Sequence, residues 1–128
     1  MVTSTRTQDD DGTVRWITST GILHRLDGPA LLLVDGSKLW FDEGMYHRDD
    51  GPAVEWSVGN NAWYLHGRLH RVDGPAIDYG NHKTFFLDDE YIADPHEFCS
   101  RVGMDSEAKS DFLDKYAEHF LKNSVDDA

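Results

Sequence analysis

Three short runs of the sequence combine a histidine, an arginine and an aspartate, the residue types that acid–base catalysis, metal binding or anion recognition would use. Each run follows the pattern His-Arg-x-Asp-Gly-Pro-Ala, and the runs begin at His24, His47 and His70, which are 23 residues apart. A fixed period marks an internal repeat. These residues therefore either carry out chemistry or build the contacts between repeats.

The spacing of the repeats excludes a metal site shared by their histidines. Equivalent residues of neighbouring β-hairpins are two strand spacings apart, about 9–10 Å, whereas zinc ligands lie about 2.0–2.1 Å from the metal. His96 and Cys99 are three residues apart on a predicted helix, but two ligands without a further motif are weak evidence for a site. The sequence has no phosphate-binding loop and no nucleophile elbow. We therefore expect no metal, no cofactor and no enzymatic activity.

The Asp-Gly-Pro triplet has a structural role that needs no ligand. We expect the Asp side chain to accept hydrogen bonds from backbone N–H groups two or three residues on, Gly to permit an unusual φ, and Pro to fix φ near about −65°. The Arg completes this corner with a charge-assisted hydrogen bond, and the His points its imidazole into the turn of the next repeat. The predicted structural turns comprise Asp27, Gly28, Pro29, Asp50, Gly51, Pro52, Asp73, Gly74 and Pro75.

Aromatic residues keep the same period as the corners. Trp40, Trp63 and Phe86 are one repeat apart, and Trp16 ends a Gly-x-x-x-Trp element that recurs at Trp40 and Trp63. One extra residue lies between Trp16 and Gly21, in a polar run where a turn can absorb it. The repeat is therefore longer than its corner motif.

The segments between the corners alternate as half-buried strands do. Val54 and Trp56 share one face of the first segment, while Leu39 and Phe41 share one face of the second, with Trp40 on the opposite face. Turns containing Asp-Gly or Gly-Asn pairs join the two segments and supply residues that tolerate positive φ. We interpret each repeat as a β-hairpin.

The pattern changes to helix after the repeats. Asp94 is placed as the N-cap of a short helix with Pro95 at its first position, and this helix should stop at Gly103. A second helix over 106–122 carries an apolar stripe at 3.6-residue spacing. We expect this stripe to pack against the end or face of the repeat sheet. The alternative is a second copy of the chain, which would make a homo-oligomer.

The expected fold class is mostly β with C-terminal α: tandem β-hairpin repeats forming a continuous antiparallel sheet, capped by two C-terminal helices. The predicted segments are a disordered tail at 1–11, β-hairpin repeats at 12–92, a helical cap at 93–122 and a disordered tail at 123–128.

The His-Arg-x-Asp-Gly-Pro-Ala runs, with the Gly-x-x-x-Trp elements between them, resemble a β-hairpin repeat of bacterial, bacteriophage and large-virus proteins that is distantly similar to MORN repeats. The resemblance covers residues 12–92, but the Asp-Gly-Pro-Ala corner replaces the Gly-x-Tyr-x-Gly core of MORN units. It implies an elongated scaffold for interactions with no common catalytic activity. It also implies a viral or bacterial source, and small acidic phage proteins of this kind are often inhibitors of host proteins that act in defence or handle nucleic acids.

Composition narrows the classes of partner. Twelve basic and twenty-four acidic residues give a net charge of −12, which disfavours direct binding of nucleic acid and anionic lipid. No apolar run approaches the roughly 20 residues that span a bilayer, and the polar first residues resemble no secretory signal. The single cysteine fits a reducing compartment. We therefore expect a cytoplasmic protein, in the host cytoplasm if the source is viral.

Two binding hypotheses remain open from the sequence. In the first, acidic groups and exposed aromatics bind a protein with a basic surface, including by mimicry of DNA. In the second, the arginine and histidine rows and the aromatic rings form pockets for an anionic, nucleotide-like small molecule. The aromatic column has a further alternative, a second core under the C-terminal helix. The candidate binding residues are Trp16, Trp40, Trp63, Phe86, Arg25, Arg48, Arg71, His24, His47 and His70.

Overall fold

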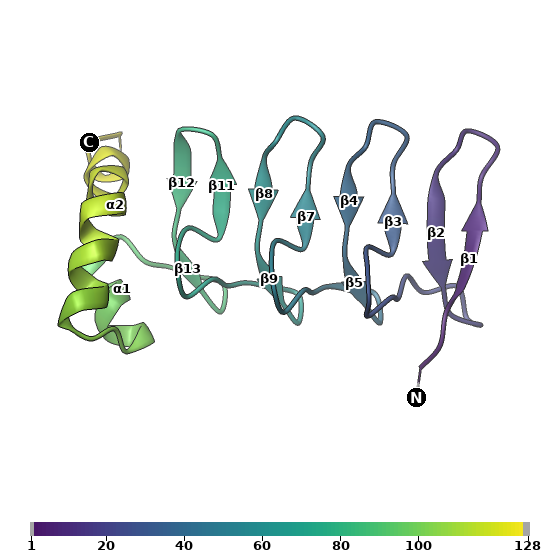
Figure 1. Cartoon of the computed structure of the whole chain (residues 1–128), viewed down its shortest axis with the longest axis horizontal. Coiled ribbons are helices and arrows are strands. Elements are labelled where there is room, and N and C mark those ends of the chain that lie inside the picture. The colour runs from purple at the N-terminus through teal and green to yellow at the C-terminus, as the bar shows by residue number, and fades with distance from the viewer. Residues whose placement is uncertain (1, 127–128) are drawn as a thin grey trace. The chain divides into compact units, whose positions relative to one another are not determined.

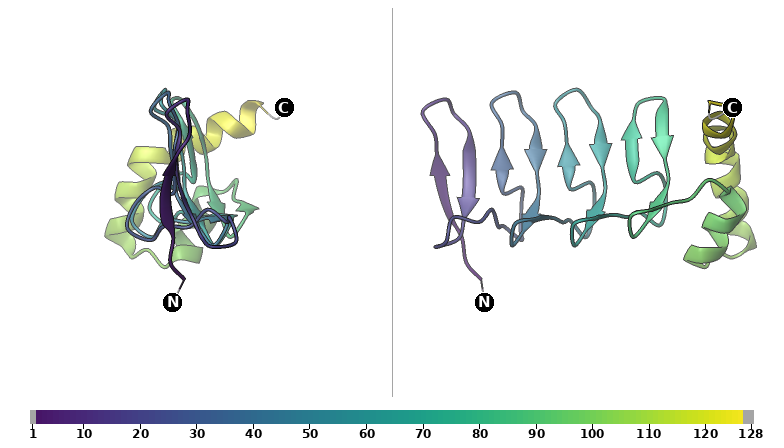
Figure 2. Two further views of the ribbon diagram at one scale, coloured as in Figure 1. Left: turned by 90° about the vertical axis from the view of Figure 1, so that its right-hand side faces the viewer. Right: turned by 180° about the vertical axis from the view of Figure 1, so that it is seen from behind.

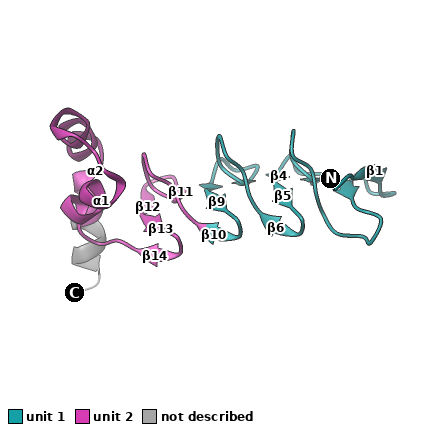
Figure 3. Cartoon of the chain, turned by 90° about the horizontal axis from the view of Figure 1, so that it is seen from below, with its two compact units in different colours: residues 1–68 teal, residues 69–128 magenta. Residues whose placement is uncertain are grey.

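The computed structural model describes residues 2–126 and shows a mostly β chain with antiparallel sheet strands and two C-terminal helices (Figure 1). It divides into two compact units, unit 1 over Met1–Arg68 and unit 2 over Leu69–Ala128 (Figure 3). The mostly β class with C-terminal α-helices is therefore confirmed.

Unit 1 contains an antiparallel sheet with the strand order β1-β2-β3-β4-β7-β8. Figure 2 shows the hairpins of unit 1 side by side, with their turns at the same edge. The strands are short, and neighbouring hairpins join through the pairs β2–β3 and β4–β7. Their bounds are β1 Thr5–Gln8, β2 Val14–Ile17, β3 Leu31–Leu32, β4 Lys38–Leu39, β7 Val54–Glu55 and β8 Asn61–Ala62.

The hairpin turns of this sheet follow directly from their glycines. In Leu33–Ser37 the N–H of Leu33 donates to the Ser37 carbonyl at 3.0 Å, and Gly36 has a φ of 94°. The N–H of Gly36 also donates to the Leu33 carbonyl at 3.0 Å, and the loops at Asp9–Thr13 and Trp56–Asn60 make the same two backbone hydrogen bonds. A three-residue loop of this kind needs one left-handed residue, which glycine adopts without strain. The Asp-Gly and Gly-Asn turns are therefore confirmed in this unit.

A second set of short hairpins interrupts the segments that the sequence predicts as single strands. β5 (Phe41–Asp42) pairs with β6 (Met45–Tyr46) through a turn in which Glu43 has a φ of 47° and Gly44 a φ of 84°. Two consecutive positive φ angles define the tight type I′ turn. A second glycine turn after the aromatic segment is expected from the sequence, but the predicted strand through Leu39 and Phe41 is not continuous, because β4 ends at Leu39 and β5 begins at Phe41. β9 (Tyr64–Leu65) and β10 (Arg68–Leu69, at the boundary between the units) form another two-stranded sheet.

The extra residue of the first repeat lies in a wider turn, as predicted. At Thr18–Ile22 the N–H of Thr18 donates to the Ile22 carbonyl at 2.8 Å, and Gly21 has a φ of 85°. This is the same three-residue loop as in the main sheet, one residue longer than the type I′ turn at Glu43 and Gly44.

The predicted disordered tail at 1–11 is the clearest error of the sequence analysis, because part of it forms a strand. Thr5–Gln8 forms β1, which pairs with β2 in the register Arg6↔Trp16. All four residues of β1 are exposed, so no apolar alternation marks the strand in the sequence. Its backbone pairs with β2, and backbone hydrogen bonds of this kind do not depend on side-chain type.

The core of unit 1 is small and centred on Leu39, Val54 and Ala62. Partly buried aromatic residues pack around it, and Leu39 and Phe41 share its side as the alternation predicts. The corner alanine Ala53 has no exposed surface, and its carbonyl accepts from the N–H of Trp40 at 2.7 Å. The backbone of this alanine therefore bonds the corner to the segment before it, and its fully buried side chain leaves no room for a larger one.

Unit 2 has a hairpin of β11 (Ile77–Tyr79) and β12 (His82–Thr84), followed by the short pair β13 (Phe86–Leu87) and β14 (Glu90–Tyr91). α1 (Pro95–Val102) and α2 (Ser106–Asp126) pack against the end of this sheet, as Figure 2 shows. α1 has the predicted caps: the Asp94 side chain accepts from the N–H of His96 at 2.9 Å, and Gly103 is left-handed.

The core of unit 2 is an aromatic cluster around Phe85, which has no exposed surface. Its ring stacks on Phe120 at 4.0 Å and meets Phe98, Phe112 and Tyr116 edge-on. The apolar stripe of α2 therefore packs on the end of the sheet within unit 2. The helix also continues past its predicted end at 122 to Asp126. Residues 127 and 128 of the predicted C-terminal tail lie outside the described residues.

Candidate functional site

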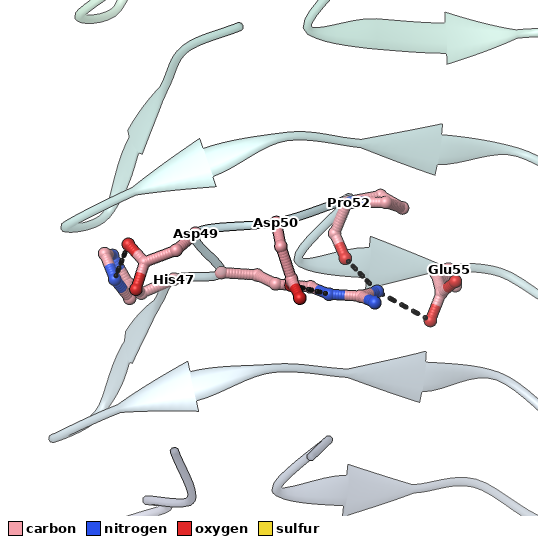
Figure 4. A network of polar contacts seen from close by, with 6 residues as sticks. His47, Asp49, Asp50, Pro52 and Glu55 are labelled. Carbon is pink, nitrogen blue, oxygen red and sulfur yellow. Dashed lines mark hydrogen bonds and ion pairs between the residues drawn. The ribbon is translucent and has the colours of Figure 1, made fainter. Parts of the chain in front are cut away.

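Each repeated corner is closed by its own arginine. In the second corner Arg48 Nε donates to Asp50 Oδ1 at 3.0 Å, and Arg48 Nη1 donates to the Pro52 carbonyl at 3.2 Å (Figure 4). Glu55 lies 3.5 Å from the same Nη1. The first and third corners repeat the two hydrogen bonds through Arg25 and Arg71. The predicted Arg–Asp bond is confirmed in all three, and the proline carbonyl is a further acceptor.

The corner glycines are required for space and not for a positive φ, which corrects the prediction. None of Gly28, Gly51 and Gly74 has a positive φ. A Cβ added at Gly51 would lie 2.9 Å from Arg48 Cζ, and a Cβ at Gly28 would lie 2.6 Å from Arg25 Cζ. The guanidinium group rests directly over the glycine, so any larger residue would displace it.

The corner aspartates also differ from their predicted role. Asp27 and Asp50 accept from the arginine Nε, and no backbone N–H donates to either carboxylate within the described residues. Their side chains are 89% and 83% exposed, and that of Asp73 is 80% exposed. The carboxylates therefore face the solvent while the arginines lie inside.

The corner histidines stabilise the tight turn of the following repeat, as predicted. The N–H of Glu43 donates to His24 Nδ1 at 2.9 Å, and the N–H of His66 donates to His47 Nδ1 at 2.9 Å. In unit 2 the N–H of Asp88 donates to His70 Nδ1 at 3.1 Å. An Nδ1 that accepts leaves the proton on Nε2 in the neutral ring. In His47 this Nε2 lies 3.0 Å from Asp49 Oδ1.

The aromatic column is half-buried, and two of its rings stack on corner arginines. Arg25 Cζ lies 3.8 Å from the ring centre of Trp16, and Arg48 Cζ lies 3.9 Å from that of Trp40. Trp16, Trp40, Trp63 and Phe86 are all half-buried. Within unit 2 the helices pack on the cluster around Phe85, to which Phe86 does not belong. Trp16 and Trp40 are therefore part of stacked Trp–Arg pairs that brace the corners.

A pocket of about 370 Å³ lies between the first two corners of unit 1. Residues 25–27 of the first corner and 47–50 of the second line it, together with Trp40 and Asp42. We call it the Trp40 pocket. Of the predicted binding residues it brings together Arg25, Trp40, His47 and Arg48, whereas the other six lie outside its lining.

The lining of the Trp40 pocket is acidic. Its two arginines are each paired with the aspartate of their own corner. Asp42 and Asp49 remain, and each lies against a histidine: Asp42 Oδ1 is 3.3 Å from His24 Nδ1, and Asp49 Oδ1 contacts His47 Nε2. With neutral histidines the lining therefore carries two uncompensated negative charges.

One buried polar atom of the pocket residue Trp40, the ring Nε1–H, makes no hydrogen bond within the described residues. An unsatisfied buried donor costs about 1–3 kcal/mol, and such groups are rare outside functional or strained sites. Trp40 is thus a position where the fold keeps an unfavourable feature.

Leu26, Asp42 and Asp49 are the pocket residues that the sequence analysis did not single out. Asp49 stands at the variable position of the corner motif, where the other two repeats have Leu26 and Val72. Asp42 directly follows the predicted strand residues Leu39 and Phe41, and it lies against His24 in the short hairpin that β5 forms with β6. The departure of Asp49 from an apolar position is the one signal the sequence offered.

The rest of the described chain shows no metal site and no membrane-spanning helix. Among the described residues no three histidine, cysteine or acidic side chains are grouped so as to hold a metal ion. None of the helices described here has the length and apolar character needed to cross a membrane.

Compared with known proteins, the chain matches no family model, no curated protein and no solved structure. The resemblance to the hairpin repeats therefore stays a prediction.

Proposed function

We propose that this chain is a tandem β-hairpin repeat scaffold that binds a protein with a basic surface and catalyses no reaction. The observation that carries the proposal is the orientation of the corner charges. The arginines of the motif are turned inward onto their own corners, while the carboxylates of Asp27, Asp50 and Asp73 are at least 80% exposed. A surface of this kind attracts cationic partners and repels anions.

The same orientation weighs against the anionic-ligand alternative. Two donor nitrogens of each corner arginine already bond within the corner, and the Arg25 and Arg48 guanidinium groups are stacked on tryptophan. The Trp40 pocket also has an acidic lining, which disfavours a phosphate. Thermal melting with a panel of nucleotides tests this alternative, because a ligand present far above its Kd raises the melting temperature.

Mimicry of DNA is one form that such binding takes, because exposed carboxylates on a regular sheet present spaced negative charges to a nucleic-acid-binding protein. Inhibition of a host protein by a phage or viral protein would follow from it. That step rests on the resemblance alone.

The test is affinity capture with the immobilised chain from a lysate of its source cell, followed by competition with heparin, a soluble polyanion. We expect a captured protein with a basic surface that heparin displaces, because both ligands would occupy the same cationic site. An acidic partner, or a partner retained unchanged in excess heparin, would refute the proposal.

A further inference from the structure

We propose that the Trp40 pocket binds the guanidinium group of an arginine side chain on the basic partner. This inference rests on the proposed function and assigns to it one anchoring site. Binding interfaces concentrate their energy in a few residues seated in pockets, and arginine is among the residues most enriched there. A pocket between two corners is the kind of feature that receives such an anchor.

The charge of the pocket selects a cation. Asp42 and Asp49 are not matched by an arginine, since Arg25 and Arg48 are already paired with Asp27 and Asp50. Asp49 is 87% exposed at its side chain and Asp42 is 28% exposed. The pocket therefore combines one carboxylate that is open to solvent with one that is largely covered, and both attract a cation.

The size and walls of the pocket favour a side chain over a larger ligand. A volume of about 370 Å³ lies near the lower end of the roughly 300–1,000 Å³ of small-molecule sites. Leu26 and the Trp40 ring provide apolar wall for the methylene groups of a long cationic side chain. An elongated ligand with an apolar stem and a charged head matches this arrangement.

Arginine fits this lining better than lysine. A planar guanidinium can donate to two carboxylates at once and stacks on aromatic and guanidinium planes, whereas an ammonium is a compact and more strongly hydrated charge. The pocket offers two separate carboxylates beside a ring that already stacks with Arg48. The same pocket therefore already contains one arginine stacked on tryptophan, the Arg48–Trp40 pair.

The experiment titrates the full chain with N-acetyl-arginine amide and follows the indole N–H signals by two-dimensional NMR. Trp40→Phe assigns the Trp40 signal by its disappearance. We expect a saturable shift of that signal, with the Trp16 signal unaffected. Nα-acetyl-citrulline amide, which has the same shape without the charge, should leave the Trp40 signal unshifted. Nα-acetyl-lysine amide, whose side chain keeps its positive charge, should bind at least threefold more weakly than the arginine probe. Equal shifts with citrulline, or no shift with arginine, would overturn the proposal.

Asp49→Asn tests the pocket with little disturbance of the fold. An asparagine oxygen can still accept from His47 Nε2, so this variant removes the charge and keeps the hydrogen bond. We expect about tenfold weaker binding of the arginine probe, the effect of losing one charge-assisted hydrogen bond. The matched control is Asp10→Asn, an equal charge change at an exposed residue outside the pocket lining, and it should bind as the unchanged chain does.

The outcomes separate the two proposals. A captured basic partner that is displaced by heparin but binds Asp49→Asn as tightly as the unchanged chain would overturn the pocket and leave the acidic surface intact. A saturable arginine site with no basic partner would support the pocket and refute the proposed function. Equal weakening by Asp49→Asn and Asp10→Asn would show a general charge effect and overturn the pocket.

Discussion

At the scale of single residues, the corner glycine and the corner arginine are matched to each other. The guanidinium of Arg48 lies over Gly51, bonds to Asp50 and to the Pro52 carbonyl, and stacks on Trp40. The motif therefore repeats because its members share one small volume. Changing one of them alters the contacts of the others.

Gly51→Ala should destabilise the chain by about 1–3 kcal/mol, because the added Cβ forces Arg48 out of its place. In an Arg48→Ala background the same substitution should cost much less, since the clash is gone. A double-mutant cycle by urea unfolding measures the coupling. Additive effects of the two substitutions would show that the arginine does not dictate the glycine.

The two ends of the corner ion pair should contribute unequally to stability. Asp50→Ala removes an exposed carboxylate and should cost less than about 1 kcal/mol. Arg48→Ala removes in addition the bond to Pro52 and the stack on Trp40, and should cost about 2 kcal/mol. Urea midpoints of both variants compare the two values. An aspartate substitution as costly as the arginine one would indicate a backbone contact of Asp50.

At the scale of elements, each unit is stabilised internally in its own way: unit 1 by its turns and unit 2 by helix packing. Unit 1 has a small core, and its hairpins are held by left-handed glycines, capped turns and corner hydrogen bonds. Unit 2 has a stacked aromatic cluster beneath α2. The stability of unit 1 should therefore respond to turn residues and that of unit 2 to apolar ones.

The turn at Asp35 should show a defined pH dependence. Its carboxylate accepts from the N–H of Ser37 at 2.8 Å, and this hydrogen bond lowers the pKa of Asp35 below its usual value. The unfolded chain therefore binds this proton more readily, so the stabilisation is present above the ordinary carboxyl pKa and is lost as the pH falls through the lowered one. The difference in stability between the unchanged chain and Asp35→Ala should shrink from pH 6 to pH 3. A constant difference over that range would contradict this role.

Removal of α2 should expose the aromatic cluster of unit 2. A chain ending at Gly103 loses Phe112, Tyr116 and Phe120 from around Phe85, and should aggregate or oligomerise. A chain ending at residue 122 keeps these three residues and is the control. Size-exclusion chromatography with light scattering distinguishes the products. A monomeric and equally stable short chain would show that α2 is an accessory arm.

At the scale of the whole molecule, the charge excess is shared by both units. Residues 1–68 contain ten acidic and six basic residues, and residues 69–128 contain fourteen and six. Affinity for the captured partner should fall steeply with salt, because the Debye length shortens from about 10 Å at 0.1 M to about 3 Å at 1 M. Isothermal titration across this range measures the slope. Salt-independent binding would exclude an electrostatic mechanism.

The sequence by itself determined the features that depend on local chemistry. The 23-residue period, the Asp-Gly turns, the caps of α1 and the apolar stripe of α2 follow from residue types at fixed spacings. The Arg–Asp bond and the imidazole contact of His47 with the following turn were also predictable, because these groups recur together.

Only the tertiary structure decided which charges face outward and which residues share a pocket. β1 has no apolar alternation, so only its pairing with β2 reveals it. Leu39 and Phe41 were predicted on one strand, but β4 ends at Leu39 and Phe41 begins β5, which folds back at Glu43 and Gly44 to pair with β6 in a separate sheet. That fold-back brings Asp42 against His24 and leaves a pocket beside Asp49, since long-range hydrogen bonding and packing, unlike turn propensity, do not appear as a local pattern.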